Sequence, residues 1–166
     1  MATTSTNKQP LLVDRVFHNV VKTDKLSSND DTSVNIAGTN SSAVVLNCVG
    51  TDGAVVEDLY VISRSGVSAY TALFYFSSAT DYLRSDEATF IGSLTSTTTI
   101  GQIRSSDTLP KILAPVPNVA DATNGNQFYA LYVPKGKVLW VTLQLAQPVS
   151  SDADTLPIVG AQGGFY

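Results

Sequence analysis

Apolar and polar residues alternate with a period of two over most of the chain after residue 41, which is the pattern of half-buried strands. β-Branched and aromatic residues dominate these runs. Strands are predicted over residues 42–49, 54–64, 67–77, 87–94, 97–103, 127–133 and 137–146. Many short strands separated by Gly, Pro and Asn are typical of an all-β fold, so we expect a single β-sandwich or jelly-roll domain.

Turn residues and alternation also predict how some of these strands are joined and which face they bury. "GTDG" at 50–53 contains an Asp-Gly pair that favours a tight hairpin turn. "VPKGK" at 133–137 places Pro134 and Gly136 between two alternating runs and predicts the clearest hairpin of the chain. On the second run the predicted core face is Leu139, Val141, Leu143 and Leu145, and the opposite face is Val138, Trp140, Thr142 and Gln144.

Residues 1–30 fit this sandwich poorly, because their apolar residues are interrupted by charged ones and followed by the loop-like "SSNDDTS". We expect residues 1–30 to form an extended N-terminal arm and residues 31–166 to form the sandwich domain. The apolar residues of the arm are too numerous for a free tail, so we expect them to contact a neighbouring subunit. They are Leu11, Leu12, Val13, Val16 and Phe17.

Two further segments interrupt the strand pattern. Residues 109–127 contain Pro110, Pro115 and Pro117, which exclude a central strand or a helix, so we expect an ordered excursion across the surface. Pro115 and Pro117 are candidate contacts to a partner within this excursion. "SATDYLRSDEA" at 78–88 predicts either one or two helical turns or a loop.

The sequence given ends in "AQGGFY", where two glycines precede Phe165 and Tyr166. Two terminal aromatic rings favour a covered position, and glycines let the backbone turn sharply and approach a neighbour closely. We expect Phe165 and Tyr166 to pack at a contact between copies or with another protein. The alternative is that the tail folds back as a final edge strand of its own sandwich.

Composition and charge narrow the partners. Charged residues make up only 14% of the 166 residues and the net charge is −4, with no basic cluster. Neither a nucleic acid nor an anionic membrane would be attracted over a distance, so we expect neither as a partner. "MATTSTNKQP" lacks the apolar core of a signal peptide, and no run approaches the roughly 18 apolar residues of a membrane helix, so synthesis in a cytosol is expected.

Candidate chemistry is sparse, and we expect no enzyme, no cofactor and no metal. His18 is the single histidine and Cys48 the single cysteine, so catalytic triads and cysteine metal cages have almost nothing to combine. His18 is expected to be a hydrogen-bonded structural residue and Cys48 a small buried one. Asp152 and Asp154 in "SSDAD" offer oxygen ligands for calcium but lack the glycine and glutamate of an EF-hand loop, which favours a solvated loop.

Aromatic residues allow a second kind of function. A flat aromatic surface beside polar groups is the usual platform for a sugar, although protein interfaces and cores use the same residues. The candidate platform consists of Tyr60, Tyr82, Phe128, Tyr129, Tyr132 and Trp140. Core and interface positions are the favoured interpretation.

Three stretches together carry a resemblance. They are "DLYVISRSGVSAYTALFYF", "LYVPKGKVLWVTLQLAQ" and the final "GGFY". Over residues 42–166 this pattern resembles small β-sandwich virion proteins of tailed bacteriophages, which often end on a glycine and tyrosine tail after the last strand. The resemblance leaves residues 1–41 unexplained, and the prolines of 109–117 suggest a docking surface particular to this chain.

The resemblance implies a structural, non-enzymatic role in the virion after assembly in the host cytoplasm. A head decoration or cement subunit is the favoured form. The implied partners are other virion proteins, either the major capsid protein or tail proteins, together with further copies in a homo-oligomer, a trimer being one option. A tail or connector component, or a receptor- or carbohydrate-binding module on the particle, is the alternative.

Overall fold

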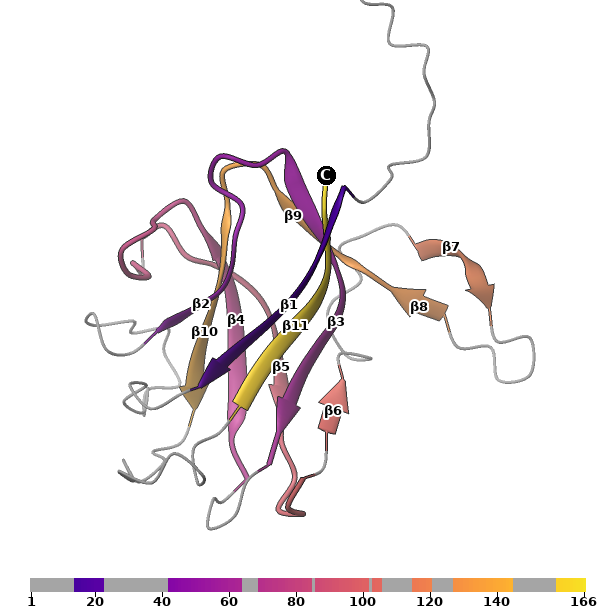
Figure 1. Ribbon diagram of the computed structural model, residues 1–166. Helices are drawn as coiled ribbons and strands as arrows, with labels where there is room; N and C mark the ends of the chain where they lie inside the picture. The colour runs from indigo at the N-terminus through magenta and orange to yellow at the C-terminus, as the bar shows by residue number, and fades with distance from the viewer. Residues whose placement is uncertain are drawn as a thin grey trace, which may run out of the picture.

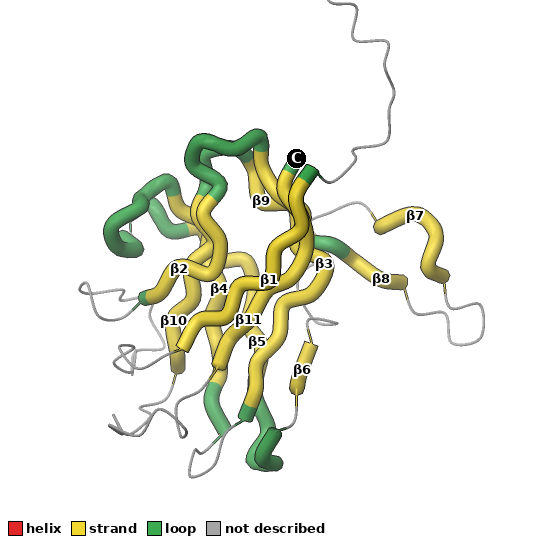
Figure 2. Tube along the Cα trace, in the orientation of Figure 1, coloured by secondary structure: helices red, strands yellow, loops and turns green. Residues whose placement is uncertain are grey.

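A computed structural model describes residues 14–22, 42–63, 69–84, 86–101, 103–105, 115–120, 127–144 and 158–166. Figure 2 shows strands joined by loops and turns in these ranges, and none of the described residues is helical. The described part of the chain therefore contains no helix long and apolar enough to cross a membrane. The prediction of an all-β fold is confirmed.

The strands form two antiparallel sheets that make a β-sandwich, as Figure 1 shows. The larger sheet has the order β1-β11-β3-β6, and β9 also pairs with β3. Its strands are β1 (Arg15–Lys22), β11 (Ile158–Phe165), β3 (Gly53–Ile62), β6 (Ile103–Ser105) and β9 (Leu131–Pro134). The smaller sheet has the order β2-β10-β4-β5, with β2 (Ala43–Asn47), β10 (Val138–Gln144), β4 (Thr71–Ser77) and β5 (Thr89–Thr95).

The core lies between the sheets and is built from the alternate, inward-facing residues of each strand. Leu59 and Val61 enter it from β3, while Leu139, Val141 and Leu143 enter it from β10. All five side chains are buried. The predicted core face of the last alternating run is therefore confirmed for these three residues, and Leu145 lies outside the described residues.

The predicted hairpin at Pro134 and Gly136 is wrong, although the turn itself is present. Lys137 N donates to Pro134 O at 3.1 Å, and Gly136 has a φ of 75°. However, β9 pairs with β3 in the larger sheet, whereas β10 pairs with β2 and β4 in the smaller one. The turn therefore passes the chain from one sheet to the other, because turn residues fix the reversal but not the strand partner.

The Asp-Gly turn at 50–53 also joins two sheets and not two paired strands, since β2 and β3 belong to different sheets. The two crossings lie side by side at one end of the sandwich (Figure 1). Cys48 N donates to Lys137 O at 3.0 Å, and Gly136 N donates to Cys48 O at 3.0 Å. Lys135 Nζ and Asp52 Oδ1 add an exposed ion pair at 2.9 Å.

Residues 15–22 differ from the extended arm that the sequence predicted. They form β1, which pairs along its whole length with β11, from Arg15 opposite Phe165 to Lys22 opposite Ile158. Period two places Phe17, Asn19 and Val21 on the core side, and the charged neighbours had obscured this alternation. The sandwich therefore includes residues 15–22, while residues 1–13 and 23–41 lie outside the described residues.

The remaining predicted elements are partly found. The strand expected over 97–103 is shorter and later, because β6 begins at Ile103 and residues 98–101 form a turn. In the proline-rich segment, β7 (Pro115–Ala120) pairs only with β8 (Gln127–Tyr129), apart from both main sheets. The described part of 78–88 is a loop, and Leu83 in it is fully buried.

Candidate functional site

The C-terminal strand β11 is an internal strand of the larger sheet, between β1 and β3. A Cβ added at Gly163 would collide with the carbonyl oxygen of Val55 on β3, at a register shift between Gln162 and Gly163. The glycine thus permits a close backbone approach, but to a strand of the same chain. This corrects the expectation that the glycines serve an approach to a neighbour.

The two final aromatic residues are covered by the same chain. Phe165 packs against the core, with its ring centroid 5.2 Å from that of Phe17, and the Arg15 guanidinium lies 4.8 Å from the Phe165 ring centroid. Tyr166 N donates to Gly53 O at 3.1 Å. The described contacts of the tail therefore agree with the alternative that the tail forms a final strand of its own sandwich. This strand is internal, whereas the alternative placed it at the edge.

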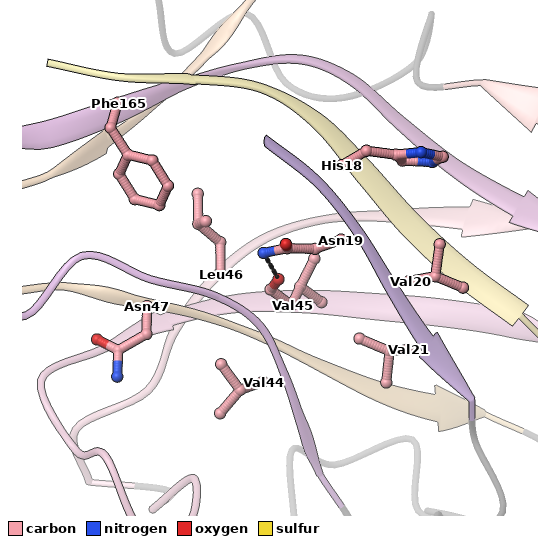
Figure 3. A pocket seen from close by; sticks show the side chains of 9 residues that line it. All are labelled: His18, Asn19, Val20, Val21, Val44, Val45, Leu46, Asn47 and Phe165. Atoms are coloured by element: carbon pink, nitrogen blue, oxygen red, sulfur yellow. Dashed lines mark hydrogen bonds between the residues drawn. The ribbon is translucent and has the colours of Figure 1, made fainter. Parts of the chain in front are cut away.

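The larger and smaller sheets both end at one side of the sandwich, where β1 and β2 are the outermost strands. The Asn19 side chain crosses from β1 to β2, and its Nδ2 donates to Val45 O at 3.0 Å. Figure 3 shows this bond, with Asn19 and Val21 on one side of β1 and His18 and Val20 on the other. The side-chain amide therefore ties together two strands that are not paired through their backbones.

A groove of about 440 Å³ lies at this edge (Figure 3). It is lined by His18, Asn19, Val20, Val21, Val44, Val45, Leu46, Asn47 and Phe165. Six of these nine lining residues are apolar and none carries a carboxylate. Val45 and Leu46 are buried, so the exposed apolar part of the groove is mainly Val20 and Val44, beside the polar His18, Asn19 and Asn47.

Exposed apolar residues lie on β1, on β2 and in the turn after β2. The exposed fraction is 81% for Val16, 50% for Val20, 37% for Val44 and 48% for Val49. Outside β6, β7 and β8, Phe90 and Ile100 are the only further large apolar residues with such exposure in the described part of the chain. We call the β1–β2 groove together with Val16, Val20, Val44 and Val49 the valine edge. Clustered exposed apolar surface marks an interaction site more often than scattered single residues do.

His18 takes part in a contact on the outer face of the larger sheet. Its Nε2 lies 2.5 Å from Tyr60 Oη, and the Tyr60 ring lies over Gly160, where an added Cβ would collide with it. Burial and the charge of Asp58 raise the pKa of the Tyr60 hydroxyl. The expectation of a hydrogen-bonded His18 agrees with this contact.

The other chemical candidates do not converge on the valine edge. Cys48 is fully buried, and burial raises the pKa of its thiol, so the thiol stays protonated near neutral pH. Within the described ranges, no three His, Cys, Asp or Glu residues form a group that could hold a metal ion. Asp152 and Asp154 lie outside the described residues.

The proposed sugar platform is not brought together either. Trp140 is 2% exposed in the smaller sheet and Tyr60 is 7% exposed in the larger one, so neither offers a free ring face. Tyr82 is stacked under Arg84, at 4.8 Å from guanidinium carbon to ring centroid. The favoured interpretation, core and interface positions, agrees with the burial of Trp140 and Tyr60.

The predicted contact residues end up in different places. Val16 is on the valine edge, while its neighbour Phe17 faces the core. Pro115 and Pro117 lie in β7, and Leu11, Leu12 and Val13 lie outside the described residues. Sequence analysis missed Val20, Val44 and Val49. The alternation of Val16, His18 and Val20 could have indicated that these side chains share the outer face of a strand.

No protein-family model matches this chain, and no curated protein and no solved structure is significantly similar to it.

Proposed function

We propose that the chain is a non-enzymatic structural protein of a tailed-phage virion, most simply a head decoration or cement subunit that stabilises the particle through contacts between subunits. Its partners are the major capsid protein and further copies of itself, and its place is the assembled virion. A tail or connector component is the alternative. The observation that carries the proposal is the valine edge, an exposed apolar surface on a folded domain whose other described large side chains are mostly covered.

The strand order supports a jelly roll as the finer description of the sandwich. Strands β1, β3, β6 and β11 belong to one sheet, while β2, β4, β5 and β10 belong to the other. The chain thus crosses between the sheets repeatedly, and the β2–β3 crossing runs beside the β9–β10 crossing. Jelly rolls of this kind occur in capsid proteins, and also in lectins and cupins, so the fold supports the role by analogy only.

The edge itself argues for assembly more directly. Soluble β proteins protect outer strands with charges, prolines or covering loops, because a free apolar edge invites another strand. Here β1 begins with Arg15 and ends with Lys22, but Val16 and Val20 between them are exposed, and Val44 is exposed on β2. No described segment of the chain covers these residues, and such surface is useful where a neighbour covers it in the particle.

The two residues most often used for nucleophilic chemistry are occupied structurally. His18 contacts Tyr60, and Cys48 is buried with its thiol protonated. Cys48 is thereby withdrawn from the groove, and His18, which lines the groove, has its Nε2 engaged by Tyr60. We therefore assign the chain a binding role and not a catalytic one.

Particles purified from the virus that encodes this chain provide the test. We expect mass spectrometry to detect the chain in intact particles, and gold-labelled antibody to mark the heads. Purified wild-type protein should rebind particles that lack it, whereas Val16→Lys should not, because lysine puts a charge into an apolar contact. Ile100→Lys, a change at an exposed apolar residue outside the valine edge, is the matched control and should rebind normally.

Absence of the chain from intact particles would overturn the proposal. Labelled tails with unlabelled heads would replace the decoration role by the tail or connector alternative. Equal rebinding by Val16→Lys and wild type would remove the valine edge from the contact.

A further inference from the structure

The free edge of β1 offers one unused row of backbone donors and acceptors. In the described part of the chain β1 pairs with β11 alone, and it stands last in the order of the larger sheet. β2 stands last in the smaller sheet, and its contact with β1 is made through the Asn19 side chain. An extended segment could therefore add to the larger sheet at β1 through main-chain hydrogen bonds.

A strand added at this edge would meet apolar surface on both of its faces. On one side lies the groove, where Val44 is exposed and Val21 is partly buried. On the other side lie Val16 and Val20, which are exposed on the outer face of the sheet. Because successive side chains of a strand point to opposite faces, the occupant must be apolar at consecutive positions.

The chain contains such a segment directly before the first described residue. Residues 10–13 are Pro-Leu-Leu-Val, so Leu11 and Val13 would face one side of an added strand and Leu12 the other. Pro10 lacks a backbone donor, which is tolerated at the beginning of an edge strand. This segment matches the requirement for apolar residues at consecutive positions.

A tight hairpin before β1 would not bring this segment into the groove of its own chain. Asp14 N donates to Phe165 O at 2.8 Å, so the backbone still follows β11 at Asp14. The tightest reversal before Asp14 is a hairpin loop of about two residues, at Leu12 and Val13. Leu12 and Val13 would then lie in the loop, and the polar residues 4–7 would lie beside His18–Val21.

We propose that the valine edge binds residues 10–13 of a second copy of this chain, as an added strand on β1. The proposal rests on the proposed function in that it names the contact by which copies associate. Leu11 and Val13 occupy one face of the edge and Leu12 the other. The copy that donates this segment binds, in its own groove, the segment of another copy.

The test uses two full-length variants that each destroy one half of the contact. Leu11→Ser combined with Leu12→Ser removes the segment, and Val44→Lys blocks the groove with a charge. We expect wild type to show concentration-dependent association by sedimentation equilibrium, and each variant to remain a monomer. A mixture of the two variants should form a one-to-one complex, because one still carries the groove and the other still carries the segment.

Binding of a synthetic peptide covering residues 8–14 tests the same contact without self-association. Fluorescence anisotropy should show that the peptide binds to the variant with Leu11→Ser and Leu12→Ser. Adding Val44→Lys to this variant should raise the Kd for the peptide at least about tenfold, because the lysine charge would be desolvated in the groove. Ile100→Lys is the control and should bind like its parent. If the Val44→Lys protein has a lower melting temperature than its parent, Val20→Ser is used in place of Val44→Lys.

The proposal is overturned if the mixture stays monomeric, if both variants associate like wild type, or if wild type stays monomeric into the millimolar range and does not bind the peptide. These outcomes are independent of the particle experiment. If the protein binds particles but shows neither association nor peptide binding, the virion role stands and this contact is rejected. If the protein associates as described but is absent from particles, the contact stands and the virion role is rejected.

Discussion

The two sheets of the sandwich differ in how their outer faces are covered. On the smaller sheet the outward residues Tyr75, Val138 and Trp140 are buried, because Leu83 of the following loop packs on them and Trp140 Nε1 donates to Ala79 O at 3.2 Å. On the larger sheet no described loop is seen to cover Val16 and Val20, which stay exposed. Among the described residues, the chain thus covers the outer face of the smaller sheet with its own segment but covers neither Val16 nor Val20 on the larger sheet.

The glycines of β11 add to this contrast. On the outer face of the larger sheet, Gly160 leaves room for the Tyr60 ring, which lies flat across the neighbouring strand. Gly163 lets β11 approach the Val55 carbonyl of β3 closely. The outer face of the smaller sheet is filled by large side chains under a loop. On the larger sheet Tyr60 is buried over Gly160, and the exposed residues are the valines of the edge strand β1.

Removing the centre of the covered face should have the largest effect on stability. Trp140→Ala deletes a side chain that is 2% exposed, packed on Leu83 and bonded to Ala79. We expect a loss of about 3–5 kcal/mol in the free energy of unfolding, measured by urea denaturation. A loss below about 1 kcal/mol would mean that the loop does not close this face.

The matched change on the uncovered sheet is Val16→Ala. Val16 is 81% exposed, so the free energy of unfolding should change by no more than about 0.5 kcal/mol in dilute solution. The pair of substitutions thus separates a face that stabilises the fold from a face that does not. Comparable losses for both would break the comparison.

Gly163→Ala should destabilise the protein less than Trp140→Ala but more than Val16→Ala. Its Cβ would collide with a backbone oxygen that cannot move without parting β11 from β3. The free energy of unfolding should fall by about 1–3 kcal/mol, the range for overpacking a buried site. Gln162→Ala, at the exposed neighbouring position, is the control and should be nearly neutral. An equally neutral Gly163→Ala would show that the register shift at this glycine is not required.

Period-two alternation predicted much of the sandwich. The run at 42–49 contains β2, the run at 137–146 contains β10, and the run at 54–64 overlaps β3 except for its first residue. Leu139, Val141 and Leu143 face the core as expected. Alternation succeeds here because each strand has one face in the core between the sheets. It could not say that the outer face of β10 is buried too, because that depends on Leu83, far away in sequence.

Other features depend on tertiary contacts that no local pattern carries. Turn residues at Pro134 and Gly136 specified a reversal, yet the strands on either side belong to different sheets. The glycine-rich "GAQGGF" has low strand propensity, and it forms β11 because Tyr60 and Val55 pack where its side chains are missing. At the candidate site, composition predicted Val16 and Phe17 as a pair, but neighbouring residues of a strand face opposite sides.

Hydrogen exchange tests the central comparison most directly. Amide exchange of the full chain should be measured by mass spectrometry at low and high protein concentration, because association adds a strand to one edge only. We expect peptides that cover residues 15–22 to gain protection at high concentration, while peptides that cover 78–84 stay as protected as before. Protection gained at 78–84, or no change at 15–22 under conditions in which copies associate, would contradict the account.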